Sequence, residues 1–572
     1  MSWPAVMLRW RGSTAMVCRR SAGLALLVLG FSFAGPGAEA GQRHAVASAH
    51  PLATRAGEEV LAAGGNAFDA AVAVASTLAV VEPFASGFGG GGFFLLHRAS
   101  DGRDIVVDAR EKAPLAATRD MYLDAQGKVD TRASLDGARA AAIPGLAAGL
   151  VHLQSRYGSR PLPDLLASAQ RHAEEGYAAD ARFVAAAGWR ESALEADALA
   201  GGAFLDGGKV PAVGFLVRQP ALGSTIRAIA ASGRDGFYRG PVAEAMVAAV
   251  AAAGGIWTLD DLANYEIVER EPQRIEYGAA RIVTAPLPSS GGLVMTQVFH
   301  ILACFDLRSL SAADRVHLVV EAMRRGYHDR SRHLGDADFV TIPEALSRRD
   351  YAVARAASID LARATPSADL EAAAPVRQGD NTTHFSVVDA QGNRVAATLS
   401  VNGPFGSAFV AGSSGVLLNN EMNDFSVAAT GGNLYGLTGF SGNIIEPGKR
   451  PLSSMSPTFL EDSRGVLVLG TPGGSRIISM VIIGILEHLA SPAVDPESVV
   501  AAPRYHHQYL PDRIEFEPGQ FGPEWVKALE GKGHVVIEGR RRWGNMQAVF
   551  VDAVTGEATP ASDPRGRAGV LF

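Results

Sequence analysis

Hydrophobic and polar positions follow two different periods along the chain, and the period changes near residue 382. Upstream of that point, apolar residues recur at intervals of three and four, which is typical of helices. Residues 53–63 and 67–81 predict two helices divided by a glycine pair, with Asn66 capping the second. The second helix is apolar on nearly every side, so we expect it to be buried. Further helical patterns predict that residues 140–350 are mainly helical.

Downstream of residue 382 the pattern becomes β-rich. Residues 383–389 and 394–401 flank the turn sequence AQGN and predict a hairpin, and helical patterns return at 475–490 and 523–533. Strand pairs with helices between them predict sheet layers covered by helices. Residues 351–381 have few large apolar side chains and are rich in Ala, Asp, Arg and Pro, which predicts an exposed, mobile linker.

Three glycines interrupt the pattern between the first helices and a predicted strand. Gly87, Gly89 and Gly92 spell GxGxxG, but a helix precedes them and a strand follows. The dinucleotide-binding motif needs the opposite order. We therefore expect a tight turn at which backbone segments approach each other closely.

Composition and charge narrow the function. The chain has 572 residues, of which 47% are hydrophobic and 19% charged, as in a packed globular protein. Its net charge is −7 and it has no basic block, which argues against nucleic acid as a partner.

The N-terminus has the pattern of an export signal over residues 1–40. Arginines precede an apolar run that starts at Ser21, and a small-x-small site lies at Ala38–Ala40. The run is short for a membrane anchor, so we expect no stable span after its removal. The mature chain would keep Cys304 alone and no internal disulfide, which fits a bacterial periplasmic or secreted protein. Because Cys304 lies in an apolar run, we expect it to be buried.

Histidines occur in two groups that could be taken for metal sites. His317, His328 and His333 share a helical pattern with several arginines, which favours a solvated polar face. His506 and His507 are adjacent in a predicted strand and would point to opposite faces. We therefore predict no metal site.

The Thr-Thr pair at residues 382 and 383 stands where the linker meets the first β-rich segment. A threonine hydroxyl in mid-chain is a weak nucleophile. If the preceding peptide bond is cut, the new α-amino group, with a pKa of about 7.7–8.0, can act as its base. On this stretch alone, two β-branched strand residues are the preferred interpretation.

Other stretches add candidate chemistry. Gly473 and Gly474 precede a helix, where backbone N–H groups can stabilise an oxyanion. Paired hydroxyls lie at Ser453 and Ser454, and carboxylates lie at Glu421 and Asp424. Each feature alone fits ordinary loop chemistry.

Taken together, these motifs resemble the γ-glutamyltransferases. The resemblance runs in family order through GGNAFDAAVAV, DAREKAP, PSSGGLVMTQ, RSRHLGDADF, TTHFSVVD, LLNNEMNDFS, KRPLSSMSP and TPGGSRII to SDPR, over residues 45–566. It implies an α/β N-terminal-nucleophile hydrolase, a four-layer αββα sandwich formed jointly by two subunits of one precursor. The implied cut between Asn381 and Thr382 gives a large subunit, 41–381, and a small subunit, 382–572, which remain a heterodimer.

The resemblance also implies roles for individual residues. Thr382 would attack the γ-glutamyl amide of a donor such as glutathione, and the γ-glutamyl-enzyme would pass to water or to an amino acid or dipeptide. Arg110 would bind the donor's α-carboxylate with Ser453 and Ser454, in line with the preference of Arg for carboxylates. The remaining residues would bind the α-ammonium (Glu421, Asp424 and Asn402), stabilise the oxyanion (Gly473 and Gly474), hydrogen-bond the nucleophile (Ser400) or form a lid (Tyr435). No cofactor or catalytic metal is implied.

Two alternatives stay open at this stage. The same scaffold could hydrolyse another amide, as a cephalosporin acylase does with a glutaryl side chain. Because that substrate lacks an α-ammonium, Glu421 and Asp424 argue against it. An unprocessed binding protein without activity is the other alternative, against which Thr382, Arg110 and the Gly473-Gly474 pair argue.

Overall fold

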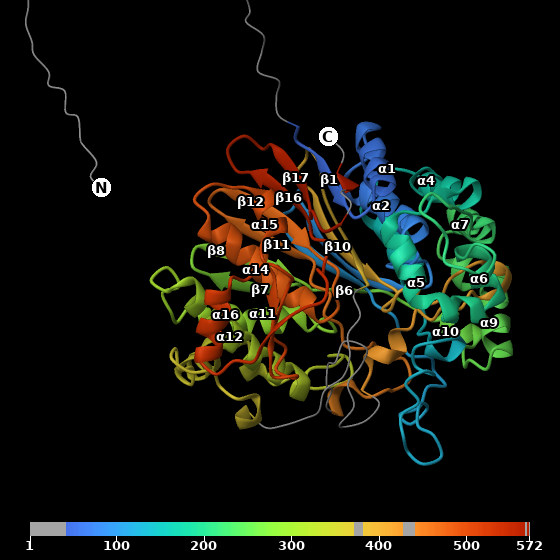
Figure 1. Cartoon of the computed structure of the whole chain (residues 1–572). Coiled ribbons are helices and arrows are strands. Elements are labelled where there is room, and N and C mark those ends of the chain that lie inside the picture. The colour runs from blue at the N-terminus through green and yellow to red at the C-terminus, as the bar shows by residue number, and fades with distance from the viewer. Residues whose placement is uncertain (1–41, 371–380, 427–440, 567–568, 571–572) are drawn as a thin grey trace, which may run out of the picture. The chain divides into compact units, whose positions relative to one another are not determined.

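A computed structural model describes residues 42–370, 381–426, 441–566 and 569–570 (Figure 1). The predicted export signal, the lid residue Tyr435 and the end of the predicted linker, 371–380, lie outside the described residues. Among the helices that are described, none has the length and apolarity that a membrane span requires.

Two antiparallel sheets form the centre of the unit that spans residues 41–572. The seven-stranded sheet has the order β18-β1-β9-β10-β2-β3-β6. Its strands are β1 (Ala45–Ser48), β2 (Gly91–Arg98), β3 (Arg103–Ala109), β6 (Val268–Arg270), β9 (Thr383–Val388), β10 (Arg394–Ser400) and β18 (Gly569–Val570). The six-stranded sheet has the order β17-β16-β12-β11-β8-β7. Its strands are β7 (Gln273–Tyr277), β8 (Ala280–Thr284), β11 (Thr458–Asp462), β12 (Gly465–Gly470), β16 (Gln547–Asp552) and β17 (Ala558–Ser562).

Helices cover the outer face of each sheet, and the inner faces pack together through β9, β10, β12 and β16 (Figure 1). The seven-stranded sheet is covered by α1 (Pro51–Ala62), α2 (Ala67–Val81) and α3 (Leu146–Tyr157), with α4 (Leu162–Glu175) and α7 (Pro220–Ser232) outside them. The six-stranded sheet is covered by α11 (Gly291–Leu302), α14 (Arg476–Ala490) and α15 (Pro496–Ala501), with α12 (Ala312–His333) and α16 (Pro523–Gly531) beyond. This arrangement confirms the predicted αββα layers and the predicted hairpin of β9 and β10.

The predicted helix pair at the start of the chain is confirmed. The Asn66 side chain accepts hydrogen bonds from the amides of Phe68 and Asp69, and Asp69 accepts one from the Asn66 amide. This capping box fixes the start of α2, and every residue of α2 is buried. The all-round apolar pattern therefore marked a helix enclosed by α1, α3, α4 and the sheet.

The glycine turn before β2 also behaves as predicted. A side chain at Gly89 would place its Cβ 2.1 Å from the Leu417 carbonyl oxygen, and Gly92 has φ of +151°. Only glycine permits this approach. The turn lets β2 pair with β10, so that Gly91 lies opposite Ser400.

The predicted linker is wrong for residues 351–370. Helix α13 (Arg349–Ala357) packs on α11 and buries Ala352 and Ala356. The following segment is held by Arg325, which donates to the Ser358 carbonyl oxygen at 2.9 Å, and by the Thr365 amide, which donates to Glu321 at 3.1 Å. Small alanines can be buried without a large apolar pattern, so composition alone gave a misleading prediction.

Two further predictions are wrong, and several strands were missed. Cys304 is exposed because α11 ends at Leu302 and the next turn faces solvent. His317 and His328 are buried, since α12 packs against α11 and α16 on faces that local pattern marks as polar. The hairpin of β7 and β8 lies within the region predicted to be mainly helical.

Candidate active site

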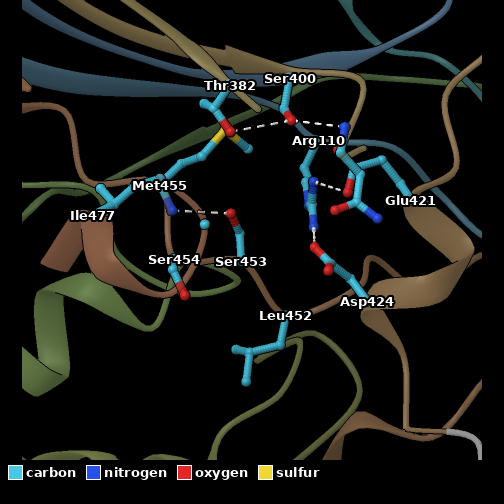
Figure 2. Close-up of a pocket in the computed structure, with 12 residues that line it drawn as sticks. Arg110, Thr382, Ser400, Glu421, Asp424, Leu452, Ser453, Ser454, Met455 and Ile477 are labelled. Carbon is cyan, nitrogen blue, oxygen red and sulfur yellow. Dashed lines mark hydrogen bonds and ion pairs between the residues drawn. The ribbon is translucent and has the colours of Figure 1, made fainter. Parts of the chain in front are cut away.

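The structure brings most of the predicted site residues into one pocket (Figure 2). The predicted residues among its lining are Arg110, Thr382, Ser400, Asn402, Glu421, Asp424, Ser453, Ser454 and Gly474. Gly473 is adjacent to Gly474. Apolar side chains of Leu452, Met455 and Ile477 complete the wall, and sequence reasoning missed them because buried apolar residues carry no chemical signal.

Thr382 lies directly before β9 with only 4% of its surface exposed. Its hydroxyl donates to the carbonyl oxygen of Asn381 at 2.6 Å and lies 3.4 Å from the Ser400 hydroxyl. Ser400 ends β10, and its Oγ accepts a hydrogen bond from the Asn402 amide at 2.7 Å. The hydroxyl is therefore held beside the carbonyl group of the peptide bond that joins Asn381 to Thr382.

The residue after Thr382 is fixed by a carboxylate that sequence reasoning missed. The Thr383 hydroxyl donates to Glu82 Oε2 at 2.8 Å, and Glu82 Oε1 accepts from Arg182 at 2.5 Å. Glu82 is fully buried at the end of α2. An acidic residue that follows an almost entirely apolar helix is the sequence signal that could have revealed it.

Arg110 is buried between two of the predicted acids. Its Nη1 lies 2.6 Å from Glu421 Oε2, and its Nη2 lies 2.6 Å from Asp424 Oδ2. Its Nε donates to the Pro451 carbonyl oxygen at 3.2 Å, which fixes the plane of the guanidinium. The resemblance placed Arg110 at one end of the donor and the acids at the other; in the structure the three side chains form one cluster.

Burial and mutual repulsion control the charge of this cluster. Burial raises the pKa of Glu421 well above its ordinary value, and the nearby Glu111 and Asp424 add to that effect. Burial likewise raises the pKa of Glu111 to about 7, although Arg110 opposes the change. Burial opposes the charge of Arg110 too, but the three acids hold the pKa of its guanidinium above the ordinary value. Arg110 is therefore a permanent cation, and it faces two glutamates, Glu421 and Glu111, that take up a proton more readily than exposed glutamates do.

Ser453 and Ser454 form the wall opposite this cluster. Ser453 Oγ accepts from the Met455 amide at 3.1 Å, so its own proton is free to be donated. Ser454 Oγ is buried and, within the described residues, has no hydrogen-bond partner. Two hydroxyl donors near Arg110 suit a carboxylate ligand.

The glycine pair has backbone angles that other residues rarely adopt. Gly473 has φ of +138° and Gly474 has φ of +55°, and α14 begins two residues later with Ser475 as its N-cap. A Cβ on Gly473 would lie 2.5 Å from Met480 Cε. The sharp turn brings Gly474 into the pocket at the N-terminal end of a helix, where N–H groups favour negative charge.

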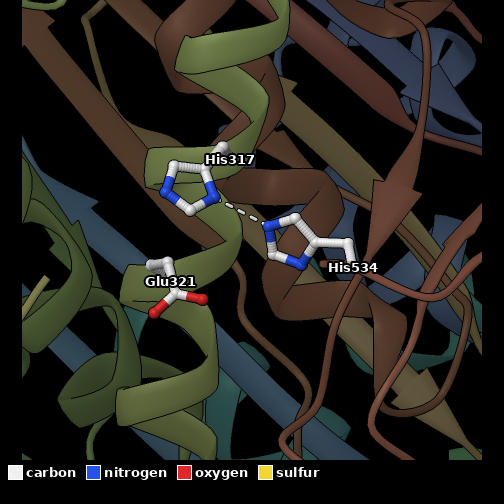
Figure 3. A group of neighbouring side chains, drawn as sticks. All are labelled: His317, Glu321 and His534. Carbon is white, nitrogen blue, oxygen red and sulfur yellow. Dashed lines mark hydrogen bonds between the residues drawn. The ribbon is translucent and has the colours of Figure 1, made fainter. Parts of the chain in front are cut away.

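One group of potential metal ligands lies elsewhere, at His317, Glu321 and His534 (Figure 3). His317 Nδ1 and His534 Nε2 share a hydrogen bond of 2.7 Å, and His317 Nε2 lies 2.9 Å from the Asp360 carbonyl oxygen. Glu321 accepts hydrogen bonds from Arg324, Arg325 and the Thr365 amide. The ring nitrogens and carboxylate oxygens of this group are already used in hydrogen bonds, and the guanidinium groups of Arg324 and Arg325 would repel a metal cation. We therefore interpret the group as a hydrogen-bonded network.

Comparison with known proteins finds similar chains over most of this sequence. The family model described as gamma-glutamyltranspeptidase matches residues 53–572. The chain is 40% identical over 549 residues to a glutathione hydrolase proenzyme of Pseudomonas sp. strain A14, covering 94% of each chain. The crystal structure of a cephalosporin acylase from Bacillus halodurans superposes with a TM-score of 0.81 at 26% identity, covering 96% of this chain and 99% of that one. The gamma-glutamyltranspeptidase of Helicobacter pylori superposes with a TM-score of 0.56 at 38% identity, covering 58% of this chain and 95% of that one.

Proposed function

Because the chain belongs to the gamma-glutamyltranspeptidase family, we propose that this pocket performs γ-glutamyl transfer with Thr382 as its nucleophile. The protein is a γ-glutamyltransferase of the glutathione hydrolase type, with the fold of the N-terminal-nucleophile hydrolases. The position of the Thr382 hydroxyl, 2.6 Å from the Asn381 carbonyl oxygen in a pocket that Arg110, Glu421 and Asp424 also line, carries the proposal.

The first reaction is cleavage of the precursor. Thr382 Oγ1 attacks the carbonyl carbon of Asn381, the peptide bond to Thr382 breaks, and an ester forms in its place. Water hydrolyses the ester, which leaves a carboxylate on Asn381 and a free α-amino group on Thr382. That amino group is the base that turnover requires.

Cleavage yields a large subunit, 41–381, and a small subunit, 382–572, that remain associated. Strand β9 of the small subunit pairs with β1 of the large one, and β10 pairs with β2. In the second sheet, β11 of the small subunit pairs with β8 of the large one. Each sheet therefore continues across the cut, and the two parts share both cores.

Donor binding uses the two sides of the charged cluster. The α-carboxylate binds Arg110 with the hydroxyls of Ser453 and Ser454, and the α-ammonium binds Glu421 and Asp424 near Asn402. The ammonium replaces part of the contact between Arg110 and the acids, so no carboxylate is left without a cation. A glutaryl donor has no ammonium to offer, which favours a γ-glutamyl donor such as glutathione.

Turnover then follows two acyl transfers. The α-amino group takes the proton of Thr382 Oγ1 as this oxygen attacks the γ-carbonyl carbon, and the N–H groups of Gly473 and Gly474 stabilise the oxyanion. The amide bond breaks, the leaving amine takes the proton, and a γ-glutamyl ester remains on Thr382. Water or the amino group of an amino acid or dipeptide attacks the ester, which predicts ping-pong kinetics. The lid assigned to Tyr435 would limit access of water.

The enzyme is proposed to act outside the cytoplasm, in the bacterial periplasm or medium. Residues 1–40 carry the charge and apolar pattern of an export signal.

Product analysis tests the proposed function. Incubation with glutathione is expected to release glutamate and cysteinylglycine in equal amounts. With glycylglycine added, part of the glutamate is replaced by γ-glutamyl-glycylglycine. Turnover of a glutaryl amide in preference to the γ-glutamyl amide would contradict the proposal and identify an acylase.

A further inference from the structure

Arg330 is a buried cation close to the pocket that no step of the proposed reaction uses. It lies in the last turns of α12, and 4% of its surface is exposed. Its Nε donates to Ser290 Oγ at 2.9 Å. In the part of the chain that the structure describes, this is the one hydrogen bond of its guanidinium, and no carboxylate lies within ion-pair distance.

Its neighbours on the same helix show how unusual this is. Arg324 and Arg325 are equally buried, but both form ion pairs with Glu321, at 3.2 and 2.7 Å. A buried charge without a partner costs several kcal/mol. A buried charge at this cost suggests a function for Arg330, and its surroundings indicate which one.

A short chain of hydrogen bonds links Arg330 to the pocket wall. Ser290 Oγ donates to the Ser453 carbonyl oxygen at 2.7 Å, and the Ser290 amide donates to the same oxygen at 2.8 Å. Ser453 lines the pocket. One helical turn before Arg330, the Tyr327 hydroxyl donates to the Ser475 carbonyl oxygen, beside the glycine turn. Helix α12 therefore supports two walls of the pocket from behind.

The charge balance of the pocket shows which ligand this arrangement suits. Arg330 and Arg110 both interact with Asp424. Burial lowers the pKa of Arg330 to about 10, so it stays charged near neutral pH. Glu421 and Glu111 hold protons more readily than free acids do. Through Ser290, Arg330 therefore places a positive charge behind the wall that holds Ser453, on the side where the donor's α-carboxylate is proposed to bind.

We propose that Arg330 is a positioning residue for the donor, which holds Ser453 in place through Ser290 and strengthens binding of the donor's α-carboxylate by its buried positive charge. This inference rests on the proposed function, and it predicts that Arg330 selects donors that carry a free α-carboxylate. Arg330 does not touch the reacting atoms, so its effect falls on KM more than on kcat.

Two donors that differ by one group separate this role from a structural one. The first is γ-glutamyl-p-nitroanilide, and the second is 4-aminobutyryl-p-nitroanilide, which lacks only the α-carboxylate. In Arg330→Gln, which keeps a donor for Ser290 but removes the charge, KM for the first donor is expected to rise about tenfold, a change of ~1.4 kcal/mol. Its kcat should stay within about twofold, and KM for the second donor should not change.

Matched variants complete the test. Arg330→Lys keeps the charge, and its KM for the γ-glutamyl donor should stay close to that of the wild type. Arg308→Gln removes an exposed arginine distant from the pocket and should change neither donor. If Arg330→Gln does not yield two chains, Ser290→Ala tests the same link and should raise KM for the γ-glutamyl donor alone. Equal losses on both donors, or an Arg330→Gln enzyme with wild-type KM, would overturn the inference. A wild-type enzyme that hydrolyses neither donor would instead refute the proposed function.

Discussion

Replacement of Asp424 by asparagine tests whether the pocket recognises a γ-glutamyl donor rather than a glutaryl donor, which lacks the α-ammonium. The change keeps the size of the side chain and an oxygen that can accept from Arg110, but it removes one negative charge. In the structure Asp424 Oδ2 accepts a hydrogen bond of 2.6 Å from Arg110, and 11% of the side chain is exposed. We propose that this carboxylate binds the donor's α-ammonium.

The size of the effect follows from that geometry. A hydrogen bond between two charged groups in a nearly buried site contributes about 1.5–3 kcal/mol. Its loss should lower kcat/KM for γ-glutamyl-p-nitroanilide by about 10- to 150-fold. A glutaryl donor has no ammonium, so its kcat/KM should change by less than about threefold. The fold itself should be little affected, because Glu421 still pairs with Arg110 at 2.6 Å.

The assay measures initial rates of p-nitroaniline release from both donors with wild type, Asp424→Asn and a control variant. Asp101→Asn is a suitable control, because this aspartate also pairs with an arginine, Arg98, but lies at the surface. A selective fall for the γ-glutamyl donor supports the assignment. Equal falls for both donors, or an unchanged γ-glutamyl rate, would refute the reasoning that Asp424 recognises the ammonium.

Three further perturbations test other parts of the structure. Gly473→Ala introduces a Cβ 2.5 Å from Met480 Cε at a φ of +138°, which should displace the oxyanion-binding N–H groups. We expect kcat, measured by steady-state kinetics, to fall by about 100-fold or more. A denaturing gel should still show two chains. Arg110→Met leaves the buried Glu421 and Asp424 without their shared cation. The free energy of unfolding, measured by urea denaturation, should fall by about 3–5 kcal/mol. An unchanged urea concentration at the midpoint of unfolding would contradict the ion-pair geometry. Burial lowers the pKa of His384 from 6.5 to about 3. Between these two pH values His384 therefore takes up a proton in the unfolded chain but not in the folded protein. Stability should therefore fall as pH drops, by about 1 kcal/mol for this group between pH 7 and 5.5, and His384→Gln should reduce that slope in thermal melts.

The features that sequence predicted well are those with a local physical signature. The period of α2, its capping residue Asn66 and the hairpin of β9 and β10 depend on neighbours in sequence, and the structure has all three. The candidate site residues were predicted from the order of the family motifs along the chain. Local patterns alone did not decide whether those residues are functional. The structure gathers them because the start of β9 and the turns after β10 and β12 open on the same pocket.

The features that sequence missed depend on partners far along the chain. Arg110 and Asp424 are 314 residues apart in sequence and pair at 2.6 Å. His317 was expected on a solvated face, but His534 and the Asp360 carbonyl group satisfy its ring nitrogens, which permits burial. Glu82 likewise gains its partners, Thr383 and Arg182, only in the folded protein. Burial of a polar group becomes predictable only when its distant partners are known.

The central claim is that Thr382 is the nucleophile for both self-cleavage and transfer. The most direct measurement is intact mass with N-terminal sequencing of the purified protein beside a Thr382→Ala variant. We expect two chains for the wild type, the smaller beginning at Thr382, and one uncut chain without donor turnover for the variant. A wild-type protein that remains a single chain, or a variant that is cut at the same bond, would contradict it.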